Sequence, residues 1–278
     1  MTVRRAVQPA QVTVLADGTR RTVPDRLATE EPMEIRAHGP GQEPAAVAVT
    51  MRTPGHDFAL ATGFLASEGL LDRAGGVAGV AYCTSGRVEQ QYNIVTVTTR
   101  APFVPPAHER TFVASASCGL CGKTALDDLS VAAAPVPDGP VIAVDVLTAL
   151  PDRLREVQAV FDQTGSLHAA ALCRADGSVV VAREDVGRHN AIDKVVGERI
   201  LDPALDPEGA PILAVSGRVS FEVMQKAAVA GIPIVVAVSA PTSLAVDVAR
   251  RTGQTLVGFV REGRATVYAG IERIAEVA

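Results

Sequence analysis

The chain has 278 residues, of which 47% are hydrophobic and 21% charged, a balance typical of a globular protein that buries a substantial core. A formal net charge of −5 argues against a protein that coats nucleic acid or an anionic membrane surface. The chain has no apolar stretch long enough to cross a bilayer and no secretory signal, so we expect a cytoplasmic protein whose cysteines stay reduced unless they bind metal or do redox chemistry.

The first part of the chain predicts a β-rich N-terminal lobe, residues 1–110. Short β-prone runs alternate here with turn signals, the clearest of which is Asp17-Gly18. An apolar face that includes Phe58 and Leu65 predicts a helix over residues 57–71. The strands expected in this lobe are residues 12–15, 33–36, 45–51, 77–83 and 93–99.

Residues 111–278 predict an α/β sandwich core that forms one unit with the N-terminal lobe. Runs such as IPIVVAV at 232–238 are apolar at successive positions, which favours strands covered on both faces in a mixed or largely parallel sheet. Strands are expected at 113–116, 169–173, 179–183, 212–215, 232–238, 256–260 and 266–268, and helices at 146–162, 189–200, 221–230 and 244–251, with one more starting at 123. Ligands collect at the carboxyl ends of strands in such sheets, where the turns SGR, SAPTS and EDVGRHN are predicted to lie.

Two of the four cysteines, Cys118 and Cys121, stand at CxxC spacing where a short strand turns into a helix. The amide groups and dipole of a helix N-terminus stabilise a thiolate, and cysteine pKa values at such places fall from about 8.5 to roughly 3.5–7.5. Gly119 and Gly122 leave the turn uncrowded, so a second sulfur can approach closely. The motif therefore predicts a nucleophilic thiol used in sulfur exchange or sulfur transfer.

Other interpretations of the CxxC are weaker. A four-cysteine zinc site would need Cys83 and Cys173, neither of which is in a second CxxC. A zinc deaminase would need His-x-Glu and a proline before the first cysteine, but no histidine has Glu two positions on and Ser117 occupies the proline position. A buried, inert cysteine pair is the remaining alternative.

The segment EDVGRHNAIDKVVG at 184–197 places several polar side chains at a helix start, where backbone N–H groups bind anions such as phosphate. Arg188 adds a bidentate donor, and His189 with Asp185 or Asp193 is a candidate acid/base pair. The alternative is an N-capped helix with ordinary surface charges. The polar residues that follow Arg188 in this segment are His189, Asn190, Asp193 and Lys194.

Lysine is rare in this chain. Only three of the 26 basic residues are lysines, Lys123, Lys194 and Lys226, and each stands in a segment discussed here. They are either functional or simply solvated surface residues. For His168 we expect a core or supporting position.

Three further turns could contact a nucleotide. SGRVSFE at 216–222 and SAPTSLA at 239–245 offer hydroxyls and amides to a phosphate, although neither is a Walker loop or GxGxxG motif. GFVREGR at 258–264 places Phe259 before Arg261 and Arg264, a combination that can stack on a base and pair with phosphate. An exposed β-hairpin turn is the default alternative.

The motifs SASCGLCGK, TGSLHAAAL, EDVGRHNAIDKVVG, SGRVSFEVMQKAAVAGIPIVVAVSAPTSLAVDVA and GQTLVGFVREGRATVY together resemble the FdhD family of formate dehydrogenase accessory sulfurtransferases. The resemblance covers about residues 111–270 and extends more weakly to about residue 11. It implies a fold similar to cytidine deaminases and a homodimer. The implied function is to take sulfur as a persulfide from a cysteine desulfurase and to pass it to bis-molybdopterin guanine dinucleotide before formate dehydrogenase receives that cofactor.

The resemblance also implies site residues. Cys118 would carry the persulfide and Cys121 would be its partner, with no permanently bound metal. The guanine dinucleotide would contact Phe259, Val260, Arg261, Glu262, Gly263 and Arg264. Two other functions stay open: a chaperone that holds the cofactor without chemistry, and a thiol–disulfide oxidoreductase, although no thioredoxin-like βαβ start surrounds the CxxC.

Overall fold

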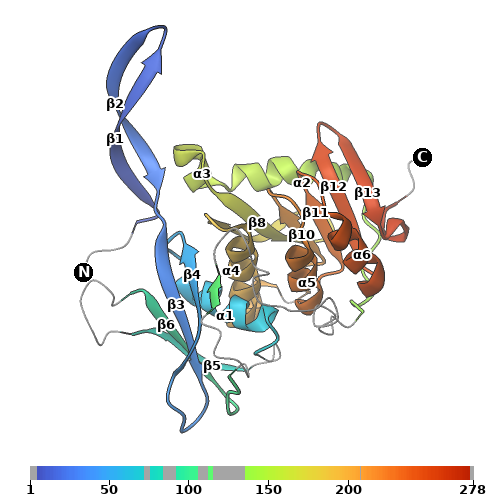
Figure 1. Cartoon of the computed structure of the whole chain (residues 1–278). Helices are drawn as coiled ribbons and strands as arrows, with labels where there is room; N and C mark the ends of the chain where they lie inside the picture. Colours follow the sequence, from blue (N-terminus) through green and yellow to red (C-terminus); the bar gives the residue numbers. More distant parts are fainter. Residues whose placement is uncertain are drawn as a thin grey trace.

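The structure is a computed structural model that describes residues 5–71, 76–83, 92–105, 112–114, 135–206 and 208–275, with the backbone alone at 112–114. A six-stranded sheet in the order β13-β12-β11-β10-β8-β9 forms the centre of the C-terminal part (Figure 1). The sheet is mixed: β10, β11 and β12 run parallel, and β8, β9 and β13 are antiparallel to their neighbours. Its strands are β8 (His168–Cys173), β9 (Val179–Asp185), β10 (Ile212–Val215), β11 (Ile234–Ala237), β12 (Thr255–Arg261) and β13 (Arg264–Ala269).

Helices cover both faces of this sheet, which confirms the predicted α/β sandwich. The helices α4 (Arg188–Leu201), α5 (Phe221–Val229) and α6 (Ser243–Thr252) pack on one face, and α2 (Val144–Glu156) packs on the other. All residues of β10 and β11 are therefore buried, which explains their continuous apolar sequence. The single helix predicted over 146–162 is wrong: Gln158 leaves the helical conformation (φ −92°, ψ 62°), and a separate helix α3 (Ala159–Thr164) follows.

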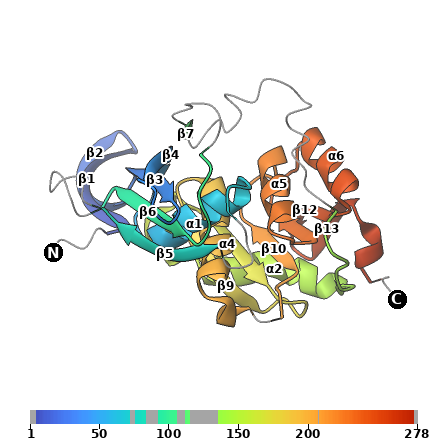
Figure 2. The same ribbon diagram turned by 90° about the horizontal axis from the view of Figure 1, so that it is seen from below.

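A second sheet, in the order β5-β6-β3-β4-β7, lies on the other side of α1 and α4 (Figure 2). Helix α1 (Asp57–Ser67) packs its apolar side chains on this sheet. The short strand β7 pairs in parallel with β4, so this segment joins the N-terminal sheet even though a boundary at 110/111 would assign it to the C-terminal part. The strands are β3 (Glu31–His38), β4 (Ala45–Arg52), β5 (Val77–Tyr82), β6 (Ile94–Thr99) and β7 (Phe112–Ala114).

The two sheets are joined through a close contact between α1 and α4. Gly63 of α1 lies against Gly197 of α4, and a Cβ built on Gly63 would come within 1.8 Å of the carbonyl oxygen of Asp193. Glycine at both positions lets the two helix backbones touch, because no side chain separates them. This contact fixes the N-terminal sheet relative to the C-terminal one.

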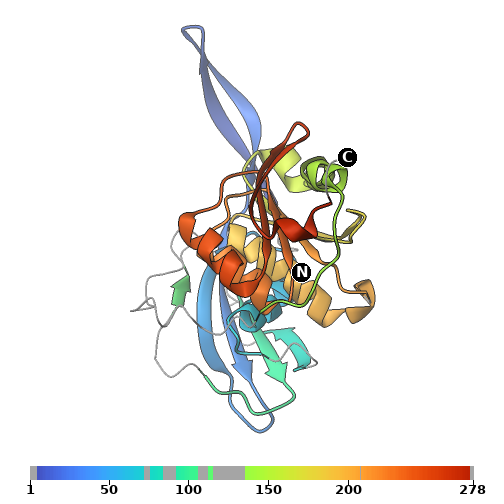
Figure 3. The ribbon, with the colours of Figure 1, turned by 90° about the vertical axis from the view of Figure 1, so that its right-hand side faces the viewer.

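A two-stranded hairpin, β1 (Val7–Ala16) and β2 (Thr19–Ala28), stands clear of both sheets (Figure 3). The turn predicted at Asp17-Gly18 is confirmed, since both residues have positive φ (49° and 69°), as a two-residue hairpin turn requires. Strand β2 was not predicted, because its arginines, proline and aspartate do not give a β-prone pattern. Arg26 Nη1 donates to Gln163 Oε1 of α3 at 3.0 Å, a contact at the base of the hairpin. Short helical turns η3 (Pro203–Leu205) and η4 (Ile271–Arg273) complete the described elements.

Candidate functional site

The polar turns singled out in the sequence meet at one edge of the six-stranded sheet. Ser216 follows β10, and its backbone N–H donates to Ala169 O of β8 at 3.0 Å. The next turn lies alongside, where Val219 N–H donates to Ala240 O at 3.1 Å. Antiparallel pairing of β8 with β9 brings His168 opposite Asp185, at the end of β9. The prediction that SGR, SAPTS and EDVGRHN share the carboxyl edge is confirmed.

Three helices begin at this edge directly after the turns. Thr242 caps α6 by accepting a hydrogen bond from Ala245 N–H at 3.3 Å. The residues at the corresponding positions of α4 and α5, Gly187 and Ser220, make no side-chain cap. The first-turn N–H groups of α4 and α5 therefore keep their donor capacity, as expected for an anion site.

His168 sits at the centre of a basic group on this edge. A Cβ built on Gly217 would lie 3.3 Å from His168 Nδ1 and 3.9 Å from Arg188 Cβ, so the glycine lets these side chains close over the SGR turn. Burial lowers the pKa of His168, and the nearby positive charges of Arg188, His189 and Arg218 lower it further, against a weaker opposite effect of Asp185. Positive charges thus outweigh the nearby carboxylate at His168.

His189 pairs with a carboxylate that the sequence did not suggest. Its Nε2 lies 2.9 Å from Glu222 Oε2 and 3.3 Å from Ser220 Oγ. Glu222 lies in the first turn of α5, and Ser220 immediately precedes that helix. Burial raises the pKa of Glu222, but the hydrogen bond and charge of His189, with other basic groups nearby, hold that pKa below its ordinary value. The signal that could have found this pair is the acidic residue two positions after Ser220 in SGRVSFE.

The proposed pairing of His189 with Asp185 is wrong because Asp185 has other partners. This fully buried carboxylate lies 2.7 Å from Lys194 Nζ, and it accepts hydrogen bonds from Asn190 Nδ2 at 3.0 Å and Thr53 N–H at 3.2 Å. Asp185, Lys194 and Asn190 thus join the start of α4 to the end of β4. Their contacts hold the start of α4 in place at the carboxyl edge of the sheet.

The alternative pairing of His189 with Asp193 is wrong as well. Asp193 faces away from the edge and accepts two hydrogen bonds from Lys226 Nζ, at 2.9 and 3.0 Å. Glu68 Oε1 lies 3.6 Å from the same nitrogen. Burial by itself lowers the pKa of Lys226, but the charges of Asp193 and Glu68 raise it above its ordinary value. Lys194 and Lys226 are therefore buried in ion pairs and are not solvated surface residues.

The stretch predicted to bind the cofactor is a β-hairpin tip at the same edge. Phe259 N–H donates to Ser239 O at 3.2 Å, and the residue is 41% exposed. Arg261 and Arg264 face each other in the hairpin register, and both are exposed. The positive φ values of Glu262 (51°) and Gly263 (72°) form the turn between them. Val260 is fully buried, so it presents no surface to a ligand in this conformation.

Cys118, Cys121 and Lys123 lie outside the described residues. The chain on both sides of them is described: Ala114 pairs with Thr50 in the N-terminal sheet, and Val136 N–H donates to Thr252 O at the end of α6. Thr50 Oγ1 also donates to Asn190 Oδ1 in the first turn of α4 at 3.3 Å. The strand that leads into the CxxC segment therefore ends next to the start of α4.

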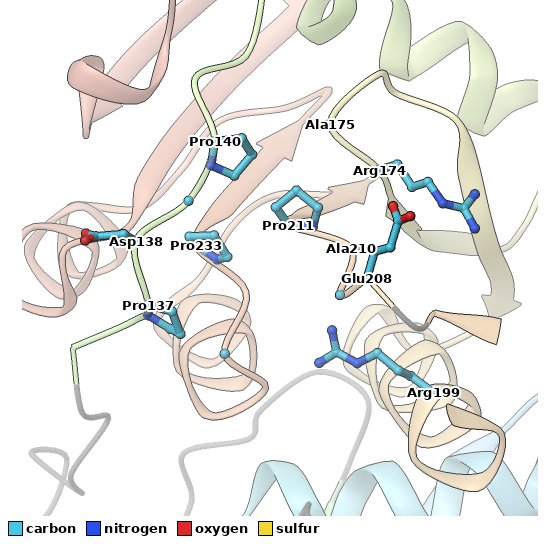
Figure 4. A pocket seen from close by; sticks show the side chains of 13 residues that line it. Pro137, Asp138, Pro140, Arg174, Ala175, Arg199, Glu208, Ala210, Pro211 and Pro233 are labelled. Carbon is cyan, nitrogen blue, oxygen red and sulfur yellow. The ribbon is translucent and has the colours of Figure 1, made fainter. Parts of the chain in front are cut away.

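Two clefts lie away from this edge. One, of about 480 Å³, is lined by Pro137, Pro140, Pro211 and Pro233 at the amino ends of β10 and β11, with Arg174, Arg199 and Glu208 around it (Figure 4). The other, of about 430 Å³, lies between the two parts of the chain near His56 and Arg183. Neither is lined by residues 259–264. Among the described helices, none combines the length and apolar character needed to cross a membrane.

Comparison with known proteins gives consistent matches over nearly the whole chain. Residues 28–275 match the model of the FdhD/NarQ family. The chain is 50% identical over 280 residues to the sulfur carrier protein FdhD of Streptomyces coelicolor, covering 98% of this chain and 96% of that protein. It is 43% identical over 286 residues to the protein of the same name from Anaeromyxobacter dehalogenans, covering 98% and 97%.

A solved structure shares the fold. The crystal structure of a protein described as a formate dehydrogenase accessory protein from Desulfotalea psychrophila aligns with a TM-score of 0.73 at 23% identity, covering 98% of this chain and 100% of that chain. The arrangement of sheets and helices is thus shared with this distant structure.

Proposed function

Because the chain belongs to the FdhD/NarQ family, we propose that it is a sulfur carrier that serves formate dehydrogenase. In this proposal the chain receives sulfur from a cysteine desulfurase and delivers it to bis-molybdopterin guanine dinucleotide. The proposal is supported mainly by one observation: β7, the strand before the CxxC, ends close to the start of α4. Ala114 lies beside Thr50, whose hydroxyl contacts the first turn of α4. Cys118 is the fourth residue after Ala114 in the sequence, which limits the distance between their Cα atoms to about 14 Å.

Sulfur loading is a displacement at sulfur. The thiolate of Cys118 attacks the terminal sulfur of the desulfurase persulfide, an S–S bond forms on Cys118, and the donor S–S bond breaks to leave the desulfurase thiolate. Release uses Cys121: its thiolate attacks Cys118 Sγ, hydrosulfide leaves, and a Cys118–Cys121 disulfide remains. The two thiols supply the two electrons that reduce the transferred sulfur, so a reductant must restore them before the next cycle.

The cofactor would be held by the hairpin tip at the carboxyl edge. The exposed ring of Phe259 suits stacking on a guanine base, and the guanidinium groups of Arg261 and Arg264 suit phosphate oxygens. Glu262 and Gly263 form the turn that keeps the two arginines side by side. Val260, fully buried between Phe259 and Arg261 in the sequence, would support the tip from below rather than contact the cofactor. The carried cofactor is a substrate in this scheme. A homodimer is part of the same proposal.

Mass spectrometry of the intact protein tests sulfur loading. After incubation with a cysteine desulfurase and cysteine, we expect one added sulfur atom on the peptide that contains Cys118 and Cys121. Cys118→Ala should abolish the adduct, whereas Cys83→Ala, a matched change at a half-buried cysteine elsewhere, should retain it.

Activation of formate dehydrogenase tests delivery. Cells that contain only Cys118→Ala should yield inactive formate dehydrogenase. Active enzyme from those cells would show that the chain binds the cofactor without sulfur chemistry, and it would refute the sulfur-carrier mechanism.

A further inference from the structure

His189 and Glu222 form a pair in which only one nitrogen of the imidazole is engaged. His189 Nε2 lies 2.9 Å from Glu222 Oε2 and 3.3 Å from Ser220 Oγ. His189 Nδ1 has no hydrogen-bond partner among the described residues. The two side chains are 17% and 18% exposed, so the pair is shielded from most of the solvent. A carboxylate that holds one nitrogen and leaves the other free is the arrangement of catalytic pairs, in which the free nitrogen exchanges a proton with a nucleophile.

The start of α4 has supports that do not involve His189. Asn190 Nδ2 donates to Met51 O at 2.8 Å, and Lys194 Nζ donates to Thr53 O at 2.9 Å. These bonds join the helix to the end of β4 and to the loop that follows it. Buried apolar side chains of α4 and α5 also share one hydrophobic core. Anchoring of α4 therefore does not account for the ionisable pair.

The strand that leads to the CxxC ends within reach of this pair. Ala114 of β7 pairs with Thr50 of β4, and neighbouring strands are about 4.8 Å apart. Thr50 Oγ1 donates to Asn190 Oδ1 at 3.3 Å, and Asn190 directly follows His189. Because Cys118 Cα lies at most about 14 Å from Ala114 Cα, the chain is long enough for its thiol to meet the imidazole.

We propose that His189 is the general base that deprotonates Cys118 during sulfur loading, and that Glu222 positions its imidazole. This inference rests on the proposed function and deepens it, because it names the group that activates the thiol. His189 Nδ1 accepts the thiol proton, and the Cys118 thiolate attacks the terminal sulfur of the donor persulfide. An S–S bond forms on Cys118 while the donor S–S bond breaks. The imidazolium then returns its proton to the donor thiolate that leaves, so protons and electrons balance.

Other charged groups surround the pair from several elements. Arg188 on α4, Arg218 in the SGR turn and Lys226 on α5 are positively charged at neutral pH. His168 on β8 has a lowered pKa, mainly because of its burial. The cations stabilise a nearby thiolate whether or not an imidazole is present. The part of thiol activation that is lost when His189 is replaced therefore reports on the imidazole itself.

The pH dependence of sulfur loading on the full chain tests the general base. Loading is followed by intact mass after mixing with a persulfide-loaded cysteine desulfurase, and the ratio of parent to variant rates removes the pH dependence of the donor. His189→Gln keeps a hydrogen-bonding side chain that cannot exchange a proton. It should load about tenfold or more slowly at about pH 7 and approach the parent rate at about pH 9, where the thiol ionises without a base. A variant equally slow at both pH values would show a structural role and overturn the assignment.

A second histidine–glutamate pair provides the matched control. His56 Nδ1 lies 2.8 Å from Glu198 Oε1, away from the carboxyl edge. His56→Gln removes the same kind of side chain and should load at the parent rate at both pH values. A loss in His56→Gln equal to that in His189→Gln would refute a specific role of the imidazole at the edge.

Combining substitutions tests the positioning role of Glu222. Residues that act as a unit are not additive, so Glu222→Gln should slow loading and the double variant His189→Gln/Glu222→Gln should be no slower than His189→Gln alone. Two losses of about tenfold that multiply to about a hundredfold would show independent roles and refute the pairing.

Alkylation of Cys118 measures thiol activation without any donor. The rate of iodoacetamide labelling as a function of pH gives the pKa of the thiol, and peptide fragment masses distinguish Cys118 from Cys121. This pKa should rise by about one unit in His189→Gln and stay at the parent value in His56→Gln. An unchanged pKa in His189→Gln, or normal loading that does not depend on His189, would overturn this inference alone. A parent chain that accepts no sulfur, although its Cys118 pKa depends on His189, would refute the proposed function alone.

Discussion

Alanine at Gly63 should destabilise the protein, because this position is where the two parts of the chain touch. A Cβ on Gly63 would lie 1.8 Å from Asp193 O and 2.6 Å from Asp193 C, both of which are backbone atoms of α4. Contacts under 3.0 Å essentially never occur for Cβ atoms, and a helix backbone cannot rotate away as a flexible side chain can. Helices α1 and α4 would therefore have to separate by about 1 Å.

The expected decrease in the free energy of unfolding follows from the loss of contact along the whole α1–α4 interface. A gap of 0.5–1 Å forfeits roughly a quarter to a half of the dispersion attraction at each contact, and overpacking of this kind costs about 1–3 kcal/mol. The severe overlap here places the cost near 3 kcal/mol. Alanine recovers about 1 kcal/mol through its better helix propensity, so the net loss is about 2 kcal/mol. This corresponds to a fall in Tm of about 4–8 °C.

Differential scanning calorimetry of Gly63→Ala gives the measurement. Gly79→Ala in β5 is the matched control, since an added Cβ there meets nothing within 4 Å and the residue has no positive φ. Its Tm should stay within about 2 °C of the parent value. A Tm for Gly63→Ala within that same range would contradict the direct backbone contact between α1 and α4.

Three further predictions test the buried groups. Lys226→Met leaves the Asp193 carboxylate buried without its cation, so the free energy of unfolding in urea should fall by about 3–5 kcal/mol. The double variant Asp193→Leu/Lys226→Met should recover most of that loss. Equal losses in the single and double variants would contradict the buried ion pair. The pKa of His168 is lowered from 6.5, so below that value the unfolded chain binds more protons than the folded chain. The free energy of unfolding should therefore decrease as the pH falls from about 7 to about 5, and His168→Gln should flatten this part of the stability–pH curve. A parent curve no steeper than that of the variant would refute the lowered pKa of His168. Burial raises the pKa of Cys173 to about 12, so iodoacetamide at about pH 8 should label this thiol only after unfolding. Peptide mapping that finds Cys173 labelled in the folded protein would contradict its burial.

Local sequence patterns determined the elements that depend only on near neighbours. The Asp17-Gly18 turn forms because residues that tolerate positive φ occupy both central positions. The run at 232–238 contains the fully buried strand β11 (Ile234–Ala237), since successive apolar residues suit a strand covered on both faces. The carboxyl edge could be predicted for the same reason: parallel strands in one sheet bring the turns that follow them to one side.

The residue pairs of the site could not be predicted in this way. His189 has carboxylates nearby in sequence, yet its partner is Glu222 on another helix. Asp185 was one of the two carboxylates considered as a partner of His189, but it lies against Lys194, further along α4. Which carboxylate meets which cation depends on helix rotation and on the packing of α4 against α5, and one sequence carries no signal for either.

By itself, the sequence determined the β-rich start, the α/β sandwich, the edge where the polar turns gather and the family, because these follow from hydrophobic periodicity, turn chemistry and long ordered motifs. The tertiary structure alone decided that β7 joins the N-terminal sheet, that two lysines are buried in ion pairs, and that Gly63 meets Gly197. The physical reason is the range of the interactions. Turns and periodic faces form between neighbours in the chain, whereas strand pairing, charge pairing and close helix contacts are chosen by packing between segments far apart in sequence.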